Sequence, residues 1–369
     1  MVYWFDIRMA MLTFPLVALL ITFPILLWHY HRFGAISRWS ILMLYSFVFY
    51  LLCAYFLIML PLPSVASVAK LTTPRYNLQP LLFIREFVDQ NPLQFSNPHT
   101  WVAAVKAPTV IQPLFNVVLT IPFGFYLRSY FHKSWWQTIL LSFCLSLFFE
   151  LTQLTGDYGI YPRSYRLFDV DDLLLNTIGG LVGFGLTRFI LPVLPTSQHI
   201  KEKLRIQSRQ VSVFRHATAF VVDWFSFSIV SMIGNGLLGN VKVLAQPVSL
   251  VSLMVVVLLP QLVWRKTLGM RLVHLKVVES NNERTTAMHV CQRWIAGYSL
   301  FLVPILIGGG LAFVSPGSQF YMYGSIVMVL ILAVIVILLG LDMMIDAFRP
   351  QHALLFERWS KTKLISDYR

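Results

Sequence analysis

The residues best suited to chemistry in this chain lie between positions 150 and 183, where one apolar segment ends and the next begins. Glu150 and Gln153 are three residues apart, so they share one face of a predicted helix. After a short loop, four polar residues follow at spacings of 3, 3 and 4, which would align them on a second helical face. They are Arg166, Asp169, Asp172 and Asn176. We expect the two faces to meet, with Arg166 as counter-ion of the acids and Asp171 pointing elsewhere.

Acidic and amide side chains in this arrangement support several functions. They can clamp one spanning helix onto another, bind the headgroup of a lipid or glycolipid, or hold a proton or cation, as intramembrane carboxylates do in transporters. Paired carboxylates also serve as general acid and base. However, no Ser or Cys nucleophile with an adjacent base, no HExxH and no Walker pattern is present. The sequence argues against an enzyme without excluding one, and it implies no cofactor and no metal site.

The composition indicates that these residues belong to a membrane protein. Hydrophobic residues make up 57% of the chain and charged residues 12%, and the mean hydropathy is +0.68, which does not describe a soluble core. The net charge of +13 is the excess of Lys and Arg expected in cytoplasmic loops that face anionic lipid, rather than a sign of nucleic-acid binding. The three cysteines form no CxxC pattern, so we predict neither a disulfide framework nor a zinc site.

Apolar stretches of about 20 residues, the length that crosses a bilayer, predict an all-α integral membrane protein with about nine transmembrane helices, five plus four. The predicted spans are 9–28, 40–60, 109–127, 137–155, 170–191, 217–238, 248–264, 295–313 and 321–341. A basic stretch separates the two sets, so we predict a membrane domain at 1–194, a cytoplasmic linker at 195–213 and a second membrane domain at 214–369. The linker is expected to be a surface helix or a flexible connector.

Lys and Arg are more frequent in alternate loops if the N-terminus lies outside and the C-terminus is cytoplasmic. This orientation places the loop at 156–168 and the long segment at 61–108 on the outer side. The long segment contains a helical pattern of apolar residues, which predicts a helix lying in the membrane interface or packed on the bundle as a lid. Those residues are Leu81, Leu82, Ile84, Phe87 and Val88.

Three residues near the polar group have predicted structural roles. Gly179 and Gly183 have the GxxxG spacing that lets another helix approach closely. Asn116 lies six residues before Pro122, so it either joins the polar group or caps a bend in its own helix.

The first half of the chain resembles the VanZ-like family of bacterial membrane proteins. The resemblance is carried by FNVVLTIPFGFYL at 115–127, ELTQ at 150–153 and RLFDVDDLLLNTIGGLVG at 166–183, and it covers about the first 193 residues. It implies that the recurring family positions are Glu150, Gln153, Arg166, Asp169, Asp172, Asn176, Gly179 and Gly183. The family is named for a determinant of resistance to teicoplanin-type glycopeptides in Gram-positive bacteria, which implies a role at the cell envelope.

The second half resembles the RDD family of small membrane domains. Arg215 and Asp223 match its opening arginine and first aspartate, and Arg293 matches an arginine that enters a later span. RKTLGMRLVHLKVV at 265–278 is similar to the TLGKRLLGLRVV-type loop of that family. The resemblance implies transport, with alkali-cation and proton exchange proposed for some members.

The closing motif departs from the RDD pattern. FERWSKT at 356–362 stands where the family has an HD..SGT-type motif, so Phe356 replaces the usual His, Glu357 the second Asp and Lys361 a Gly. One acid is kept, but chemistry that depends on the His is put in doubt.

Read without the family, the same residues have structural explanations. Arg215 and Asp223 lie two helical turns apart, and could form an ion pair through a neighbouring helix. In the basic segment after residue 264, three apolar side chains, Leu272, Leu275 and Val277, predict an interfacial hairpin. It would be held against anionic lipid by Arg265, Lys266, Arg271 and Lys276.

The leading functional hypothesis is a cell-envelope protein of the bacterial plasma membrane that lowers susceptibility to teicoplanin-type glycopeptide antibiotics. It would do so by engaging a lipid or lipid-linked headgroup at the outer leaflet. The expected partners are membrane lipids, lipid-linked cell-wall precursors or lipoglycopeptides, and not nucleic acid. The alternatives are an ion-coupled transporter that exchanges alkali cations for protons, and a non-catalytic envelope scaffold.

Overall fold

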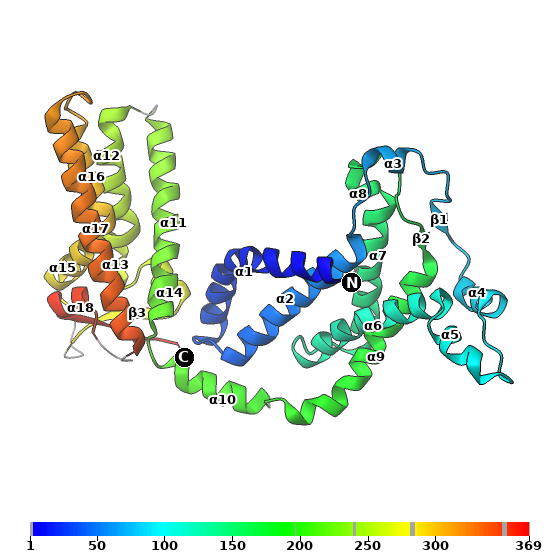
Figure 1. Cartoon of the computed structure of the whole chain (residues 1–369). Helices are drawn as coiled ribbons and strands as arrows, with labels where there is room; N and C mark the ends of the chain where they lie inside the picture. The colour runs from blue at the N-terminus through cyan, green and yellow to red at the C-terminus, as the bar shows by residue number, and fades with distance from the viewer. Residues whose placement is uncertain (1–2, 196, 239–240, 281–284, 349–352, 369) are drawn as a thin grey trace. The chain divides into compact units, whose positions relative to one another are not determined.

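The computed structural model describes residues 3–195, 197–238, 241–280, 285–348 and 353–368, which form two compact units (Figure 1). The first unit consists of Met1–Leu20 and Arg38–His199, and the second of Ile21–Ser37 and Ile200–Arg369. Residues 21–37 therefore group with the second unit, although they lie early in the chain. The predicted domain limits at residues 194 and 214 remain a prediction.

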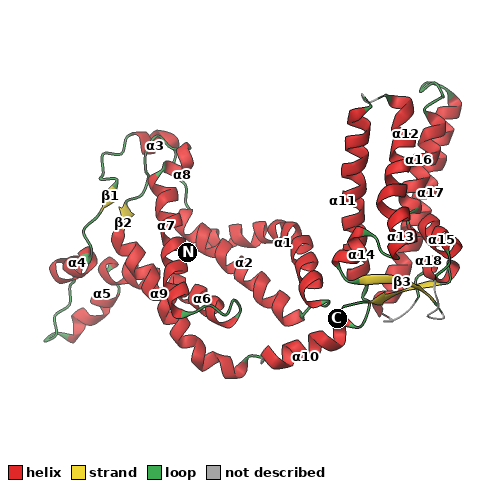
Figure 2. Cartoon of the chain, turned by 180° about the vertical axis from the view of Figure 1, so that it is seen from behind, coloured by secondary structure: helices red, strands yellow, loops and turns green. Residues whose placement is uncertain are grey.

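Helices dominate both units (Figure 2). Within the described residues, eight helices are long and apolar enough to cross a membrane. A ninth span is possible only as the pair Ala287–Gly297 and Ser299–Leu311, whose axes meet at 77°. The prediction of an all-α integral membrane protein with about nine spans is confirmed. The span predicted at 295–313 corresponds to this bent pair, in which the chain turns at Tyr298, whose side chain bonds to another helix.

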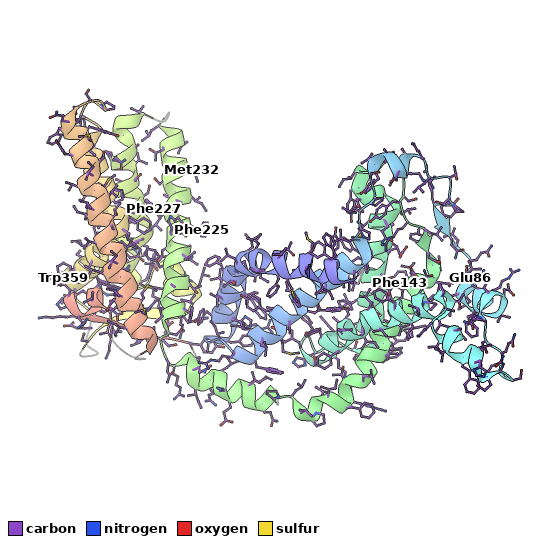
Figure 3. All side chains as sticks on the ribbon, viewed as in Figure 1. Glu86, Phe143, Phe225, Phe227, Met232 and Trp359 are labelled. Carbon is purple, nitrogen blue, oxygen red and sulfur yellow. The ribbon has the colours of Figure 1, made fainter. Side chains whose placement is uncertain are left out.

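Apolar side chains project outward from the spanning helices. Figure 3 shows Phe225 and Met232 on α11 (Val213–Leu237), where these side chains are 53% and 69% exposed. Such exposure on a helix of spanning length is expected where the solvent is hydrocarbon. The protein is thus a multi-pass membrane protein that sits in lipid.

The first unit is built from long helices joined by one long loop at residues 61–107. Its elements are α1 (Tyr3–Phe33, whose second half belongs to the other unit), α2 (Arg38–Met59), α3 (Val65–Ala69), β1 (Tyr76–Asn77), α4 (Leu82–Gln90), η1 (Pro98–Thr100), α5 (Trp101–Val105), α6 (Pro108–Ser129), α7 (Trp135–Leu154), α8 (Gly156–Gly159), β2 (Phe168–Asp169), α9 (Val170–Ile190) and η2 (Leu191–Val193). Local sequence sets the helix starts. Pro108 occupies the first turn of α6, and Ser134 and Gln137 form a capping box at α7.

The long loop is attached to the start of α9 by a short parallel strand pair. Tyr76 of β1 lies opposite Phe168 of β2, and Asn77 lies opposite Asp169. Arg163 strengthens the attachment by donating hydrogen bonds to backbone carbonyls of the loop. The loop and the segment before α9, predicted to share one side of the membrane, therefore lie at the same end of this unit.

Asp171 also holds the long loop. Its Oδ1 accepts a hydrogen bond from the N–H of Leu81 at 2.6 Å, and its Oδ2 accepts one from the N–H of Phe83 at 3.1 Å. These donors flank the start of α4, which has no side-chain cap of its own. The helix predicted from the apolar residues 81–88 is confirmed as α4, while its contact with the membrane interface or the bundle stays a prediction.

The helices α6 and α9 pack closely against each other through glycines. A Cβ atom on Gly183 would lie 1.9 Å from the carbonyl oxygen of Ile121, and one on Gly179 would lie 2.2 Å from that of Val117. No side chain larger than hydrogen fits at these positions unless the helices separate. This close approach brings the polar residues of the two helices within hydrogen-bonding range.

The second unit and the segment that leads into it contain a helical bundle with a small sheet at one end. Their elements are α10 (Ser197–Ser208), α11 (Val213–Leu237), α12 (Lys242–Leu253), the π-helical η3 (Met254–Leu258), α13 (Leu259–Trp264), α14 (Leu268–Leu272), β3 (Leu275–Glu279), α15 (Ala287–Gly297), α16 (Ser299–Leu311), α17 (Gln319–Phe348), α18 (Leu355–Trp359) and β4 (Thr362–Ser366). Figure 1 shows α11, α12, α16 and α17 running side by side. The helix alternative predicted for the linker holds for residues 197–208.

The segment after α14 is a strand rather than an interfacial hairpin, so that prediction is wrong. Strand β3 pairs antiparallel with β4, with Leu275 opposite Ser366 and Glu279 opposite Thr362. Its inward side chains, Leu275 and Val277, are buried in a core with Val273. Pairing with residues 362–366 satisfies the backbone and removes these apolar side chains from contact with lipid.

Replacing Gly183 with Ala should force α6 and α9 apart. Because the added Cβ would overlap the carbonyl of Ile121, we expect a loss of about 1–3 kcal/mol of stability. The measurement is the Tm of the purified protein in detergent. Gly185→Ala is the matched control, because a Cβ there meets nothing within 4 Å. Equal Tm values for both variants would contradict the close packing.

Replacing Asp171 with Asn should loosen the long loop, because an amide keeps only one oxygen for the two N–H donors that the carboxylate serves. We expect roughly 5–30-fold faster hydrogen exchange in residues 81–90, the factor that corresponds to about 1–2 kcal/mol. Asp89→Asn is the control, since Asp89 is exposed on the same helix and pairs only with Arg85 among the described residues. Unchanged exchange in Asp171→Asn would show that the loop is held otherwise.

Candidate functional site

A polar seam joins α6, α7 and α9 inside the first unit. From α6 it contains Asn116 and Thr120, from α7 Ser146 and Glu150, and from β2 and α9 Asp169, Asp172 and Asn176. The helix α7 carries a row of buried polar side chains, namely Thr138, Ser142, Ser146 and Glu150. The sequence reading missed the first three, although their spacing of four residues was a usable signal.

Glu150 lies at the centre of the seam and is 4% exposed. Its Oε2 accepts a hydrogen bond at 3.0 Å from the backbone N–H of Asp169, the residue that caps α9. Gln153 is equally buried but faces another helix, because its Nε2 donates to the carbonyl of Ile58 in α2 at 3.1 Å. Glu150 and Gln153 therefore lie on the same helix but bond to different elements.

The prediction that Arg166 and Asp169 lie on the same helical face as Asp172 is wrong, because α9 begins only at Val170. Asp169 is the N-cap, and its Oδ1 accepts from the N–H of Asp171 at 2.9 Å and from the amide of Asn77 at 3.1 Å. Burial raises the pKa of Asp169, and the neighbouring charge of Asp171 adds to the effect.

Arg166 forms no direct ion pair with the acids among the described residues, so its role as their counter-ion stays a prediction. Its side chain is exposed and donates to the carbonyl of Leu60 at 3.2 Å. No Lys or Arg lies within 4 Å of Glu150, Asp169 or Asp172 in the part of the chain that the structure describes. Amide donors and the N-terminal end of α9 lie beside the acids.

Asn116 joins the seam rather than capping a bend. Its side-chain amide donates to Oδ1 of Asp172. One turn further into α9, Asn176 donates to the hydroxyl of Ser146 at 2.9 Å, and its backbone carbonyl accepts from Thr120 at 2.8 Å. These bonds tie three helices together through polar groups that have no water to bond in a membrane.

The chemistry available at the seam is that of carboxyl oxygens that accept hydrogen bonds. Across the described residues, Oε1 of Glu150 and Oδ2 of Asp172 receive no hydrogen bond, and no group of three His, Cys, Asp or Glu is arranged to hold a metal ion. Donor groups such as hydroxyls and ammonium ions complement such oxygens, whereas phosphates are repelled by them.

In the second unit, Arg215 and Asp223 each bond to separate partners, so the ion pair considered for them does not form. Arg215 is fully buried and donates to backbone carbonyls of Ser208, Gln210, Val273 and His274 and to the hydroxyl of Ser366. It thereby ties the end of α10 to the residues that precede β3 and to the last residue of β4. Sequence alone offered no sign that carbonyls would be its partners.

Asp223 is the anchor for the bend between α15 and α16. Its carboxylate accepts from the hydroxyl of Thr267 at 2.7 Å, the N–H of Gly269 at 2.8 Å and the hydroxyl of Tyr298 at 2.8 Å. Tyr298 lies between the two bent helices, so this contact fixes their junction to α11.

Arg293 and Glu357 form a buried ion pair, with Nη1 and Oε1 3.3 Å apart. The guanidinium also lies 4.9 Å from the ring centre of Phe356, which stands where the resemblance expected a His. Lys361 has a φ of 51°, the left-handed conformation that Gly adopts without strain.

Each half of the chain matches the model of a known protein family. Residues 47–191 match the family model described as VanZ/LLP1, and residues 211–361 match that of the RDD family. No curated protein and no solved structure matches the chain. The two resemblances predicted from the motifs are confirmed. The chain is therefore a multi-pass membrane protein in which a segment that matches the VanZ/LLP1 family model is followed by a segment that matches the RDD family model.

Proposed function

We propose that this envelope protein binds the headgroup of a membrane lipid or lipid-linked cell-wall precursor at the polar seam, and thereby lowers susceptibility to teicoplanin-type glycopeptides. The observation that carries the proposal is the group of Glu150 on α7 with Asp169 and Asp172 at the start of α9, with no Lys or Arg within 4 Å among the described residues. A purely structural contact between helices gains little from several like charges, because each carboxylate raises the cost of ionising the next.

The charge of the seam favours one class of headgroup. Glu150, Asp169 and Asp172 offer acceptor oxygens, so the ligand must bring donors, as the hydroxyls of a sugar or the ammonium of an amine headgroup do. Arg166, exposed at the edge, adds a single donor beside them. A glycolipid or an amine-bearing lipid therefore fits better than a headgroup that consists of phosphate alone.

The proposal includes an orientation. With the N-terminus outside and the C-terminus in the cytoplasm of a bacterial cell, the long loop and the start of α9 face the cell wall. Support comes from the excess of Lys and Arg in the opposite loops. Headgroups of the outer leaflet and lipid-linked precursors lie on this side, and glycopeptide antibiotics act there.

Ion-coupled transport has weaker support from the second unit. Asp223 already accepts three hydrogen bonds, and Glu357 is paired with Arg293. A cation bound at either carboxylate must displace these partners. Under this proposal, proteoliposomes show no proton movement driven by sodium or potassium.

Neutralising the seam should abolish its effect on antibiotic susceptibility. In a deletion strain, the wild-type gene should restore the teicoplanin inhibitory concentration, whereas Glu150→Gln and Asp172→Asn should not, because an amide lacks the charge that a donor headgroup recognises. Glu86→Gln is the control, since Glu86 is an exposed acid on α4 (Figure 3). Equal teicoplanin and vancomycin susceptibility in all strains, with expression verified, would overturn the proposal.

Direct binding provides a second prediction, measured by native mass spectrometry of the full chain after exchange into nanodiscs. We expect diglucosyl diacylglycerol or phosphatidylethanolamine to be retained in preference to phosphatidylglycerol. Asp172→Asn should weaken retention about 10–100-fold, the loss that accompanies a hydrogen bond to a charged group. Preference for phosphatidylglycerol would contradict the assignment of the seam as an acceptor site.

A further inference from the structure

The second unit contains a cavity that neither the resemblances nor the proposed function explains. Its volume is about 340 Å³, within the range of small-molecule sites. Apolar side chains from α11, α16, α17 and α18 form most of its wall, including Phe220, Leu300, Val336, Leu339, Leu354 and Phe356. A space of this size among apolar side chains is costly to leave empty, so it calls for an occupant.

The cavity is also lined by His216, whose two ring nitrogens are buried and have no hydrogen-bond partner within the described chain. The charged groups that line the cavity, unlike His216, have hydrogen-bond partners. Asp223 and Arg293 have the partners given above, and Asp342 accepts from the N–H of Leu355 at 2.6 Å. Since a buried polar group without a partner costs about 1–3 kcal/mol, the imidazole is the group that a ligand would satisfy.

The cavity extends to the lipid-facing surface of a spanning helix. Val336 lines it and is 55% exposed, and Gly340 lines it one turn further along α17. The stretch Gln319–Ile345 is long and apolar enough to cross the membrane. A ligand that reaches the cavity between these residues therefore comes from the hydrocarbon, and its body is apolar.

We propose that this cavity binds an uncharged lipid that carries a hydroxyl group, such as a long-chain alcohol or an acylglycerol, with the chain against the apolar wall and the hydroxyl bonded to His216. A hydroxyl both donates and accepts, so it suits either ring nitrogen of a neutral imidazole. A charged headgroup is disfavoured, because the ionic groups at the wall already have partners and a further buried charge would have none.

The chain offers a variant that fills the cavity without disturbing its helix. A Cβ on Gly340 meets nothing within 4 Å, and the residue lines the cavity. Gly340→Phe should therefore occupy the space that the lipid uses. Gly310→Phe is the matched control, because Gly310 of α16 is equally open and does not line the cavity. Replacing a helical Gly also favours the helix in both variants, so neither should unfold it.

The test uses the full chain in nanodiscs with a photoreactive hexadecanol, followed by digestion and mass spectrometry. We expect labelled peptides from α11 and α17, lost in Gly340→Phe and kept in Gly310→Phe. Unlabelled hexadecanol should compete better than hexadecane, hexadecanoate or hexadecylamine. In His216→Leu, this advantage over hexadecane should fall about fivefold, as for one hydrogen bond.

Equal labelling of Gly340→Phe and Gly310→Phe would overturn the site itself. Competition by hexadecanoate or hexadecylamine as strong as that of hexadecanol would overturn the uncharged headgroup, and an unchanged preference in His216→Leu would overturn the role of the imidazole. The Tm of each variant shows whether it is folded, so loss of labelling in an unfolded protein is not counted as support.

Discussion

Polar groups inside a bilayer must find their partners within the protein, because hydrocarbon offers none. This constraint shapes both units. In the first, a carboxylate on α7 accepts from the backbone at the start of α9, and amides from α6 and α9 complete the set. In the second, a buried arginine is surrounded by backbone carbonyls, and a buried aspartate by two hydroxyls and an N–H.

The two units differ in how many hydrogen-bonding groups of their buried polar residues remain without a partner. Arg215 and Asp223 use their bonding capacity on the fold, so they explain why the bent pair, the strands and α10 stay together, and they leave little for a ligand. The seam of the first unit keeps acceptor oxygens on Glu150 and Asp172 without a donor among the described residues. The acids of the first unit therefore keep bonding capacity that Asp223 and Glu357 of the second unit have already used.

Much of this could be predicted from the sequence. Apolar length located the spans, and residue type identified most of the polar group, because both signals are local, whereas the place of Asn116 was left open between two alternatives. The errors have a common physical cause, which is pairing between distant residues. The strand contact of residues 76–77 with 168–169 delays the start of α9 and takes Arg166 out of the helix. Likewise, β3 is buried because the last residues of the chain pair with it. Periodicity carries no information about such partners.

The attachment of the long loop has a further consequence. Asp169 holds Asn77 with its side chain and Glu150 with its backbone, while Asp171, two residues further along the chain, holds the start of α4. The loop and the seam therefore share hydrogen bonds and cannot rearrange independently. A molecule that binds one arrangement of the loop therefore changes the affinity of the seam for its own ligand. By thermodynamic linkage, the seam ligand changes the affinity of the loop for that molecule by the same factor. The loop and the seam are thus two coupled surfaces, and binding to the exposed loop changes the environment of the buried acids.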